Sequence, residues 1–167
     1  MLFEKIAESL LQDGIVLCRV ESIEQGEGEP PPLAETDGIE VRVLARLSDA
    51  DASWLGVHLA GHALQWASKP NARRWDLRKT GKNSTLSEVL TYEEQAGAYA
   101  MNALERVAQL QSWYWSRARA DWRSYGAWLV SAGWSGEVPD MQERDPETCH
   151  YRPCFFPPGR AFEVPRY

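Results

Sequence analysis

Two histidines four residues apart, His58 and His62, are the clearest candidates for metal chemistry in this sequence. On a helix this spacing puts both imidazoles on one face, as a pair of zinc ligands requires. The segment is HLAGH, which lacks the glutamate that follows the first histidine in the HExxH motif of metallopeptidases. The pair therefore suits a metal, whereas a hydrolytic function has little support.

A second group of candidate ligands, Cys149, His150 and Cys154, lies near the end of the sequence. Thiolates and neutral imidazoles together form tetrahedral zinc sites, so this group could complete a site with His58 and His62. The gap between the two cysteines is wider than in most zinc knuckles. In the alternative interpretation, the histidines are hydrogen-bonded at the edge of the core and the cysteines are ordinary thiols. We expect no cofactor, with zinc as the alternative.

Other nucleophilic or acidic residues lack the neighbours that catalysis needs. Cys18 falls in a predicted strand, where we expect a small buried apolar side chain. Glu93 and Glu94 fall near a predicted helix start, where we expect capping or solvated carboxylates. Neither a phosphate-binding glycine loop nor a GxSxG motif occurs. The sequence therefore favours a protein that is not an enzyme.

The most distinctive composition is a block rich in tryptophan and arginine. Five of the eight tryptophans fall between residues 113 and 134. Guanidinium groups stack on indoles, and both residue types are frequent at the centres of protein interfaces. The residues that we expect to bind a partner here are Trp113, Trp115, Arg119, Trp122 and Arg123. Core packing of the same side chains is the alternative.

The charges divide the sequence into acidic and basic zones. Residues 1–40 contain ten acidic and two basic residues, and the whole chain carries a net charge of −6. This balance argues against nucleic acid or a membrane surface as the partner, since both are anionic. A basic connector at residues 69–82 is the exception, and its Arg73, Arg74, Arg78 and Lys79 are candidates for contact with an anionic partner. Docking of this connector on the acidic N-terminal zone is the alternative.

The length of 167 residues and an apolar fraction of 44% fit one globular domain. The first residues lack the apolar region of a signal peptide, and no apolar run approaches the roughly 18 residues that span a bilayer. We therefore expect a cytoplasmic protein with free thiols.

Hydrophobic periodicity predicts the elements of the N-terminal part. Residues 2–12 have helical spacing, and residues 15–23 and 39–47 have the composition of strands. Between the strands, residues 25–38 have loop composition, so we expect an antiparallel pair. Residues 51–67 have helical spacing, although the alternation of Leu55, Val57 and Leu59 would also suit a third strand.

Residues 85–134 have helical character almost throughout, and capping-box spacing occurs at Thr85 with Glu88 and at Thr91 with Glu94. One helix of this length would measure about 75 Å, more than the width of such a domain. Breaks are expected at Gly97, residues 111–112 or residues 124–126. The last two would permit an antiparallel helical hairpin, and the alanine-rich first half permits close packing.

The proline- and aromatic-rich residues 135–167 indicate an irregular strap. The predicted fold is a single α+β domain over residues 1–167, with an N-terminal helix and a small antiparallel sheet (1–48), a dominant helical part (49–134) and the strap (135–167). We expect a non-catalytic module that binds another protein, for example as an inhibitor or an immunity-type protein. The alternatives are a metal-dependent or zinc-stabilised protein that uses His58 and His62, and a homo-oligomer assembled through the long helix.

Overall fold

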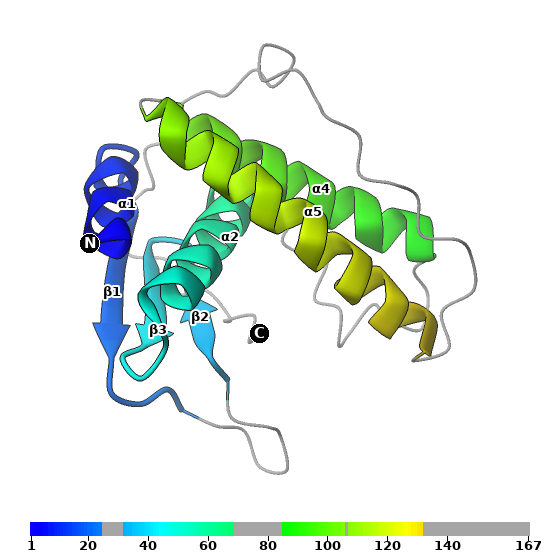
Figure 1. The fold of residues 1–167 in the computed structure, drawn as a ribbon, viewed down its shortest axis with the longest axis horizontal. Helices are drawn as coiled ribbons and strands as arrows, with labels where there is room; N and C mark the ends of the chain where they lie inside the picture. Colours follow the sequence, from blue (N-terminus) through cyan, green and yellow to red (C-terminus); the bar gives the residue numbers. More distant parts are fainter. Residues whose placement is uncertain (25–31, 69–84, 106, 132–167) are drawn as a thin grey trace.

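The computed structural model describes residues 1–24, 32–68, 85–105 and 107–131, and within these ranges the chain has the predicted α+β class. The predicted strap and basic connector lie outside the described residues. The elements in chain order are α1 (Leu2–Leu11), β1 (Val16–Val20), β2 (Ala34–Thr36), β3 (Glu40–Leu44), α2 (Asp49–Ser68), α4 (Leu86–Ala103) and α5 (Ala108–Ser131) (Figure 1).

The sheet is mixed, with β3 between β1 and β2. β1 runs parallel to β3, with Val16 opposite Glu40, and β2 runs antiparallel to it, with Ala34 opposite Val43. The predicted antiparallel pairing of residues 15–23 with residues 39–47 is therefore wrong. The third strand is β2, which lies in the segment that was predicted to be loop. Residues 55–59, the predicted alternative, belong to α2.

A tight turn at Asp37 and Gly38 explains this topology. One carboxylate oxygen of Asp37 accepts hydrogen bonds from the backbone N–H groups of Ile39 and Glu40, at 2.9 and 2.8 Å, and Gly38 has φ of +97°. Glycine adopts this conformation without the steric cost that other residues incur. The turn folds β2 back on β3 as its antiparallel neighbour, and β1 then pairs with the other edge of β3.

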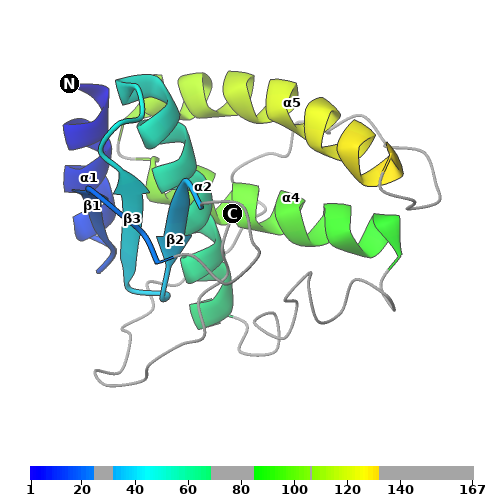
Figure 2. The ribbon, with the colours of Figure 1, turned by 90° about the horizontal axis from the view of Figure 1, so that it is seen from below.

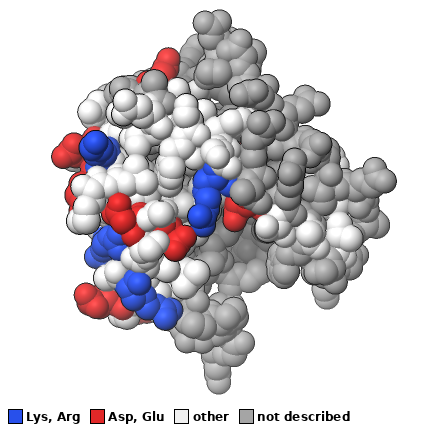
Figure 3. All heavy atoms as spheres, in the orientation of Figure 1, with Lys and Arg blue, Asp and Glu red and all other residues white. Residues whose placement is uncertain are grey.

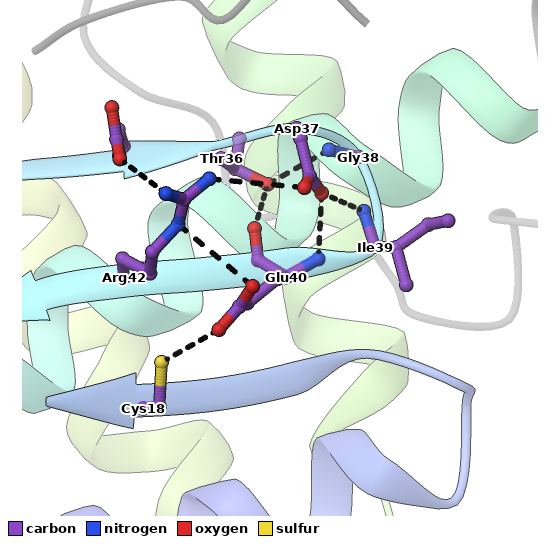
Figure 4. A network of polar contacts seen from close by, with 8 residues as sticks. Cys18, Thr36, Asp37, Gly38, Ile39, Glu40 and Arg42 are labelled. Carbon is purple, nitrogen blue, oxygen red and sulfur yellow. Dashed lines mark hydrogen bonds and ion pairs between the residues drawn. The ribbon is translucent and has the colours of Figure 1, made fainter. Parts of the chain in front are cut away.

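An arginine at the centre of the sheet holds the carboxylates around this turn together. The guanidinium group of Arg42 lies 2.9 Å from Glu35, 3.8 Å from Asp37 and 3.9 Å from Glu40 (Figure 4). Three acidic side chains, one on β2, one in the turn and one on β3, thus share one cation. Over α1, the sheet and the start of α2, acidic and basic side chains alternate on the face seen in Figure 3.

Cys18 belongs to the same polar group and is not the buried apolar residue that we expected. Its thiol is partly exposed and donates a hydrogen bond of 3.1 Å to Glu40. Burial, followed by this hydrogen bond, raises the pKa of the thiol to about 11. The thiol therefore stays protonated at neutral pH.

Helix α2 lies between the sheet and α4 and is buried on most of its surface (Figure 2). Its length agrees with the prediction for residues 51–67. Aspartates at its start bind neighbouring elements, since Asp49 accepts a hydrogen bond of 2.9 Å from the backbone N–H of Leu2, and Asp51 pairs with Arg117 of α5 at 3.1 Å. α2 is thus the central element of the described fold.

Helix α4 begins at the first predicted capping box, where Thr85 and Glu88 exchange hydrogen bonds. The second box, at Thr91, lies within α4. The helical structure is interrupted between Ala103, where α4 ends, and Ala108, where α5 begins. All three predicted break points are therefore wrong. Leu104 is completely buried at this turn, and the side chain of Gln111 donates a hydrogen bond of 3.0 Å to the carbonyl of Met101 near the end of α4. Burial of an apolar residue and satisfaction of a terminal carbonyl, without glycine or proline, end the helix here.

A glycine on α2 permits the close approach of α4. A β-carbon at Gly61 would lie less than 3.0 Å from the backbone carbonyl oxygen of Ala96. Ala96 and Ala100 are both fully buried at this contact, in agreement with the close packing predicted for the alanine-rich segment. None of the described helices has the length and apolar character needed to cross a bilayer.

Replacement of Gly61 by alanine should lower the free energy of unfolding by about 1–3 kcal/mol, because its methyl group meets rigid backbone. Gly56→Ala is the matched control, since a β-carbon there meets only the flexible side chain of Leu17. We expect Gly56→Ala to change stability by less than about 1 kcal/mol, because better helix propensity offsets the crowding. Urea unfolding measures both values, and equal losses would contradict the close contact.

Candidate metal centre

The predicted histidine pair of α2 meets a carboxylate of α4. The Nε2 atoms of His58 and His62 lie 3.3 and 3.1 Å from the same oxygen, Oε2, of Glu93. The side chain of His62 is fully buried and that of Glu93 is 6% exposed, whereas His58 is 18% exposed. Three residues that can bind a metal thus converge where α2 and α4 pack together, with their ligand atoms within 4.8 Å of one another.

The expectation of a capping or solvated Glu93 is wrong, because α4 starts at Leu86 and places Glu93 in its interior. The signal was present in the sequence. The buried positions of α4 follow helical spacing and include Leu86, Val89, Leu90, Glu93, Ala96 and Ala100. An acidic residue within such a stripe needs a partner in the core, and here the partners are the two histidines.

Glu93 is ionised at neutral pH in this environment. Burial alone would raise the pKa of its carboxyl group, since a charge is poorly solvated in the core. The positive partial charges and hydrogen bonds of His62 and His58 act in the opposite direction and hold the pKa well below its usual range. The histidines therefore stabilise the charged form of Glu93.

A neighbouring amide orients His62. The Nδ1 atom of His62 lies 3.2 Å from Oε1 of Gln65, and Nε2 of Gln65 donates a hydrogen bond of 3.0 Å to the carbonyl of Tyr92. The second bond fixes which end of the amide is the acceptor, so the contact with His62 requires a hydrogen on Nδ1. This arrangement directs Nε2 of His62 towards Glu93. Metal-binding histidines commonly donate a hydrogen bond from their other ring nitrogen in this way.

Aromatic rings surround the cluster. The ring of Trp54 stacks on His58 with a centroid distance of 5.8 Å, and Tyr92 stacks on His62 at 4.9 Å. Tyr114 of α5 stacks in turn on Trp54 at 5.0 Å. Burial, and then the charge of Glu93, raise the pKa of Tyr114, which therefore remains a neutral phenol. The rings limit the movement of both imidazoles and exclude water from one side of each.

Two of the three distances between candidate ligand atoms are compatible with the ligand spacing of a transition-metal site. Ligands at about 2.0–2.1 Å from a metal are separated by about 3.3–3.4 Å in a tetrahedron and by about 2.9 Å in an octahedron. The two nitrogen–oxygen distances, 3.3 and 3.1 Å, lie within this interval. The second oxygen of Glu93, Oε1, is buried and has no hydrogen-bond partner among the described residues. The cluster therefore offers a carboxylate with unused binding capacity.

The other predicted site residues do not join this cluster in the described part of the chain. Cys149, His150 and Cys154 lie outside the described residues, as do Arg73, Arg74, Arg78 and Lys79. Trp113 and Trp115 are partly buried and pack against the core. The side chains of Arg119, Trp122 and Arg123 are also outside the description.

The chain was compared with models of known protein families, with curated protein sequences and with solved structures, and none of the three comparisons found a match. Function must therefore be argued from the site itself.

The depressed pKa of Glu93 predicts a specific acid sensitivity. A carboxyl whose folded pKa lies below its unfolded value, near 4.5, stabilises the protein above that value and loses this contribution as the pH falls further. At pH 6 and without metal, Glu93→Gln should lower the free energy of unfolding by about 1.5–3 kcal/mol. This difference should shrink as the pH is lowered from 5 to 3.5, as measured by urea unfolding with a chelator present.

Glu8→Gln, at an exposed position of α1, provides the control and should have almost no effect at any of these pH values. A deficit of Glu93→Gln that stays constant down to pH 3.5 would show that Glu93 is not an ionised partner of the histidines.

Proposed function

We propose that the protein binds one divalent transition-metal ion, with zinc as the best fit, through Nε2 of His58, Nε2 of His62 and the carboxylate of Glu93. The observation that carries the proposal is the convergence of both nitrogens on one buried carboxylate oxygen at 3.3 and 3.1 Å. Imidazole and carboxylate are established zinc ligands, and this set of three is typical of zinc sites that keep one position open.

A metal would also resolve the energetics of the cluster. The histidines stabilise the charge of Glu93 through Oε2, whereas Oε1 is buried without a hydrogen-bond partner among the described residues, which costs free energy. A divalent cation would use both the histidine lone pairs and the free oxygen of Glu93. Because its ligands come from α2 and α4, it would also join the two helices, and metal bound only by the folded state would stabilise it.

Peptide hydrolysis is not part of this proposal. In HExxH enzymes the residue after the first histidine is a glutamate that acts as general base. Leu59 takes that position here and is completely buried. The donor set alone also suits Fe²⁺, so the choice between zinc and iron belongs to the experiment.

The protein-binding module, its inhibitor or immunity-type role, the homo-oligomer and the cytoplasmic location remain predictions from the sequence. They are compatible with a metal site. The two described tryptophans of the predicted binding surface, Trp113 and Trp115, pack against the core, so no observation favours that surface over the metal centre.

Metal binding tests the proposal directly. Chelator-treated protein should bind one Zn²⁺ per chain, and His58→Ala, His62→Ala and Glu93→Gln should each weaken binding by about 100-fold or more, because each removes one of three ligands. Calorimetry with a competing chelator gives the affinities, and elemental analysis gives the stoichiometry for Zn²⁺ and Fe²⁺. Circular dichroism shows whether each variant is folded.

Glu94→Gln is the matched control, because it changes the adjacent, partly exposed carboxylate and should retain the affinity. Absence of stoichiometric metal would overturn the proposal and leave a buried His–Glu ion pair. Intense thiolate-to-metal absorption in the Co²⁺ protein would also contradict this ligand set, because it would identify cysteine as a ligand.

Gln65 provides an independent test of the arrangement. Gln65→Leu should lower the metal affinity by about 10–100-fold, because His62 loses the acceptor that orients it. Gln65→Glu should retain more of the affinity than Gln65→Leu, since a carboxylate still accepts the Nδ1 hydrogen although it loses the bond to the carbonyl of Tyr92. A purely structural role of Gln65 would predict the opposite order or equal effects in the same calorimetric titration.

A further inference from the structure

We infer that the metal centre takes up a small anion from outside the chain, at a coordination position beside His58, and that no further carboxylate of the described metal-binding cluster acts on it as a general base. The inference rests on the proposed function, because it concerns the ligand that such a metal would hold in addition to its three protein ligands. The expected ligands are anions with one strong oxygen or sulfur donor, such as carboxylates, hydroxamates and thiolates.

The charge of the metal centre favours an anionic ligand. A divalent cation with two neutral imidazoles and one carboxylate has a net charge of about +1, which is costly in a buried site. The described residues in ring contact with the histidines, Trp54, Trp66 and Tyr92, carry no charge. An anionic additional ligand would neutralise the site, whereas a neutral one would not.

The three ligand side chains differ in their exposure to solvent. His62 is fully buried and Glu93 nearly so, while His58 has 18% of its side chain exposed. A ligand from solvent would therefore approach on the His58 side. Trp54 is stacked on His58 and is itself buried. An exposed fraction as small as that of His58 suits a small anion better than an extended polypeptide.

The segment that carries the two histidines lacks the general base of HExxH enzymes. Activation of a metal-bound water for attack on a peptide needs a nearby group that accepts its proton. The position that supplies this group in HExxH enzymes is occupied by the buried side chain of Leu59. Within the described metal-binding cluster the single carboxylate is Glu93, which is itself a ligand. The centre should therefore hold an anion without hydrolysing peptides.

The experiment uses the full chain loaded with Co²⁺, whose visible absorption reports changes in coordination. Acetohydroxamate and acetate should each change the spectrum in a saturable way, with one anion bound per metal. Acetamide, the neutral counterpart of acetate, should bind about tenfold more weakly than acetate or not at all. Metal content measured after each titration shows that the anion has not removed the ion.

Each outcome has a distinct meaning. If the protein binds no metal, the proposed function fails and the anion question does not arise. If the metal binds but neither anion changes the spectrum, the coordination shell is closed and the inference is wrong. Equal binding of acetate and acetamide would refute the charge argument, and metal-dependent cleavage of casein would refute the absence of a base.

Discussion

The contact between α2 and α4 at Gly61 is the constraint on which the rest of the described site depends. Because Gly61 has no side chain, the backbone of α4 approaches α2 at Ala96. One residue later on α2, His62 reaches Glu93, which lies one turn before Ala96 on α4. A wider helix separation would lengthen both histidine–carboxylate distances. The His58–His62–Glu93 cluster therefore depends on small residues in the core as much as on its own side chains.

The local features of the fold could be predicted from the sequence, because they depend on neighbouring residues. The helical spacing of residues 2–12 and 51–67 and the capping box at Thr85 all correspond to observed elements. The strand pairing could not be predicted in the same way. It depends on β2, a strand of three residues, and on the Asp37–Gly38 turn that folds it onto β3.

The candidate site was half predicted. His58 and His62 were identified by their spacing, since two residues four apart lie on the same face of a helix in any fold. Glu93 is 31 residues from His62, and its role depends on the phase and position of a second helix. Gln65 was missed because an amide that orients a histidine has no sequence signature beyond a position on the same helix.

The described site combines well-positioned side chains with one unsatisfied carboxylate oxygen. Gln65 fixes one imidazole, stacked rings hold both, and the carboxylate retains an oxygen without a partner. A buried His–Glu pair also needs its remaining donors and acceptors satisfied, so the Gln65 contact and the stacked rings fit both a pair and a metal site. The feature that a pair alone leaves unsatisfied is Oε1 of Glu93.

The burial of the Cys18 thiol, together with its hydrogen bond to Glu40, has a practical consequence for the other two cysteines. A pKa near 11 instead of 9.0 lowers the thiolate fraction at neutral pH roughly 100-fold, and the greater nucleophilicity of the more basic thiolate recovers roughly tenfold of this. Alkylating reagents should therefore modify Cys18 about ten times more slowly than an ordinary thiol. Brief labelling would place spectroscopic probes selectively at Cys149 and Cys154 if those thiols have ordinary reactivity, without any substitution in the sheet.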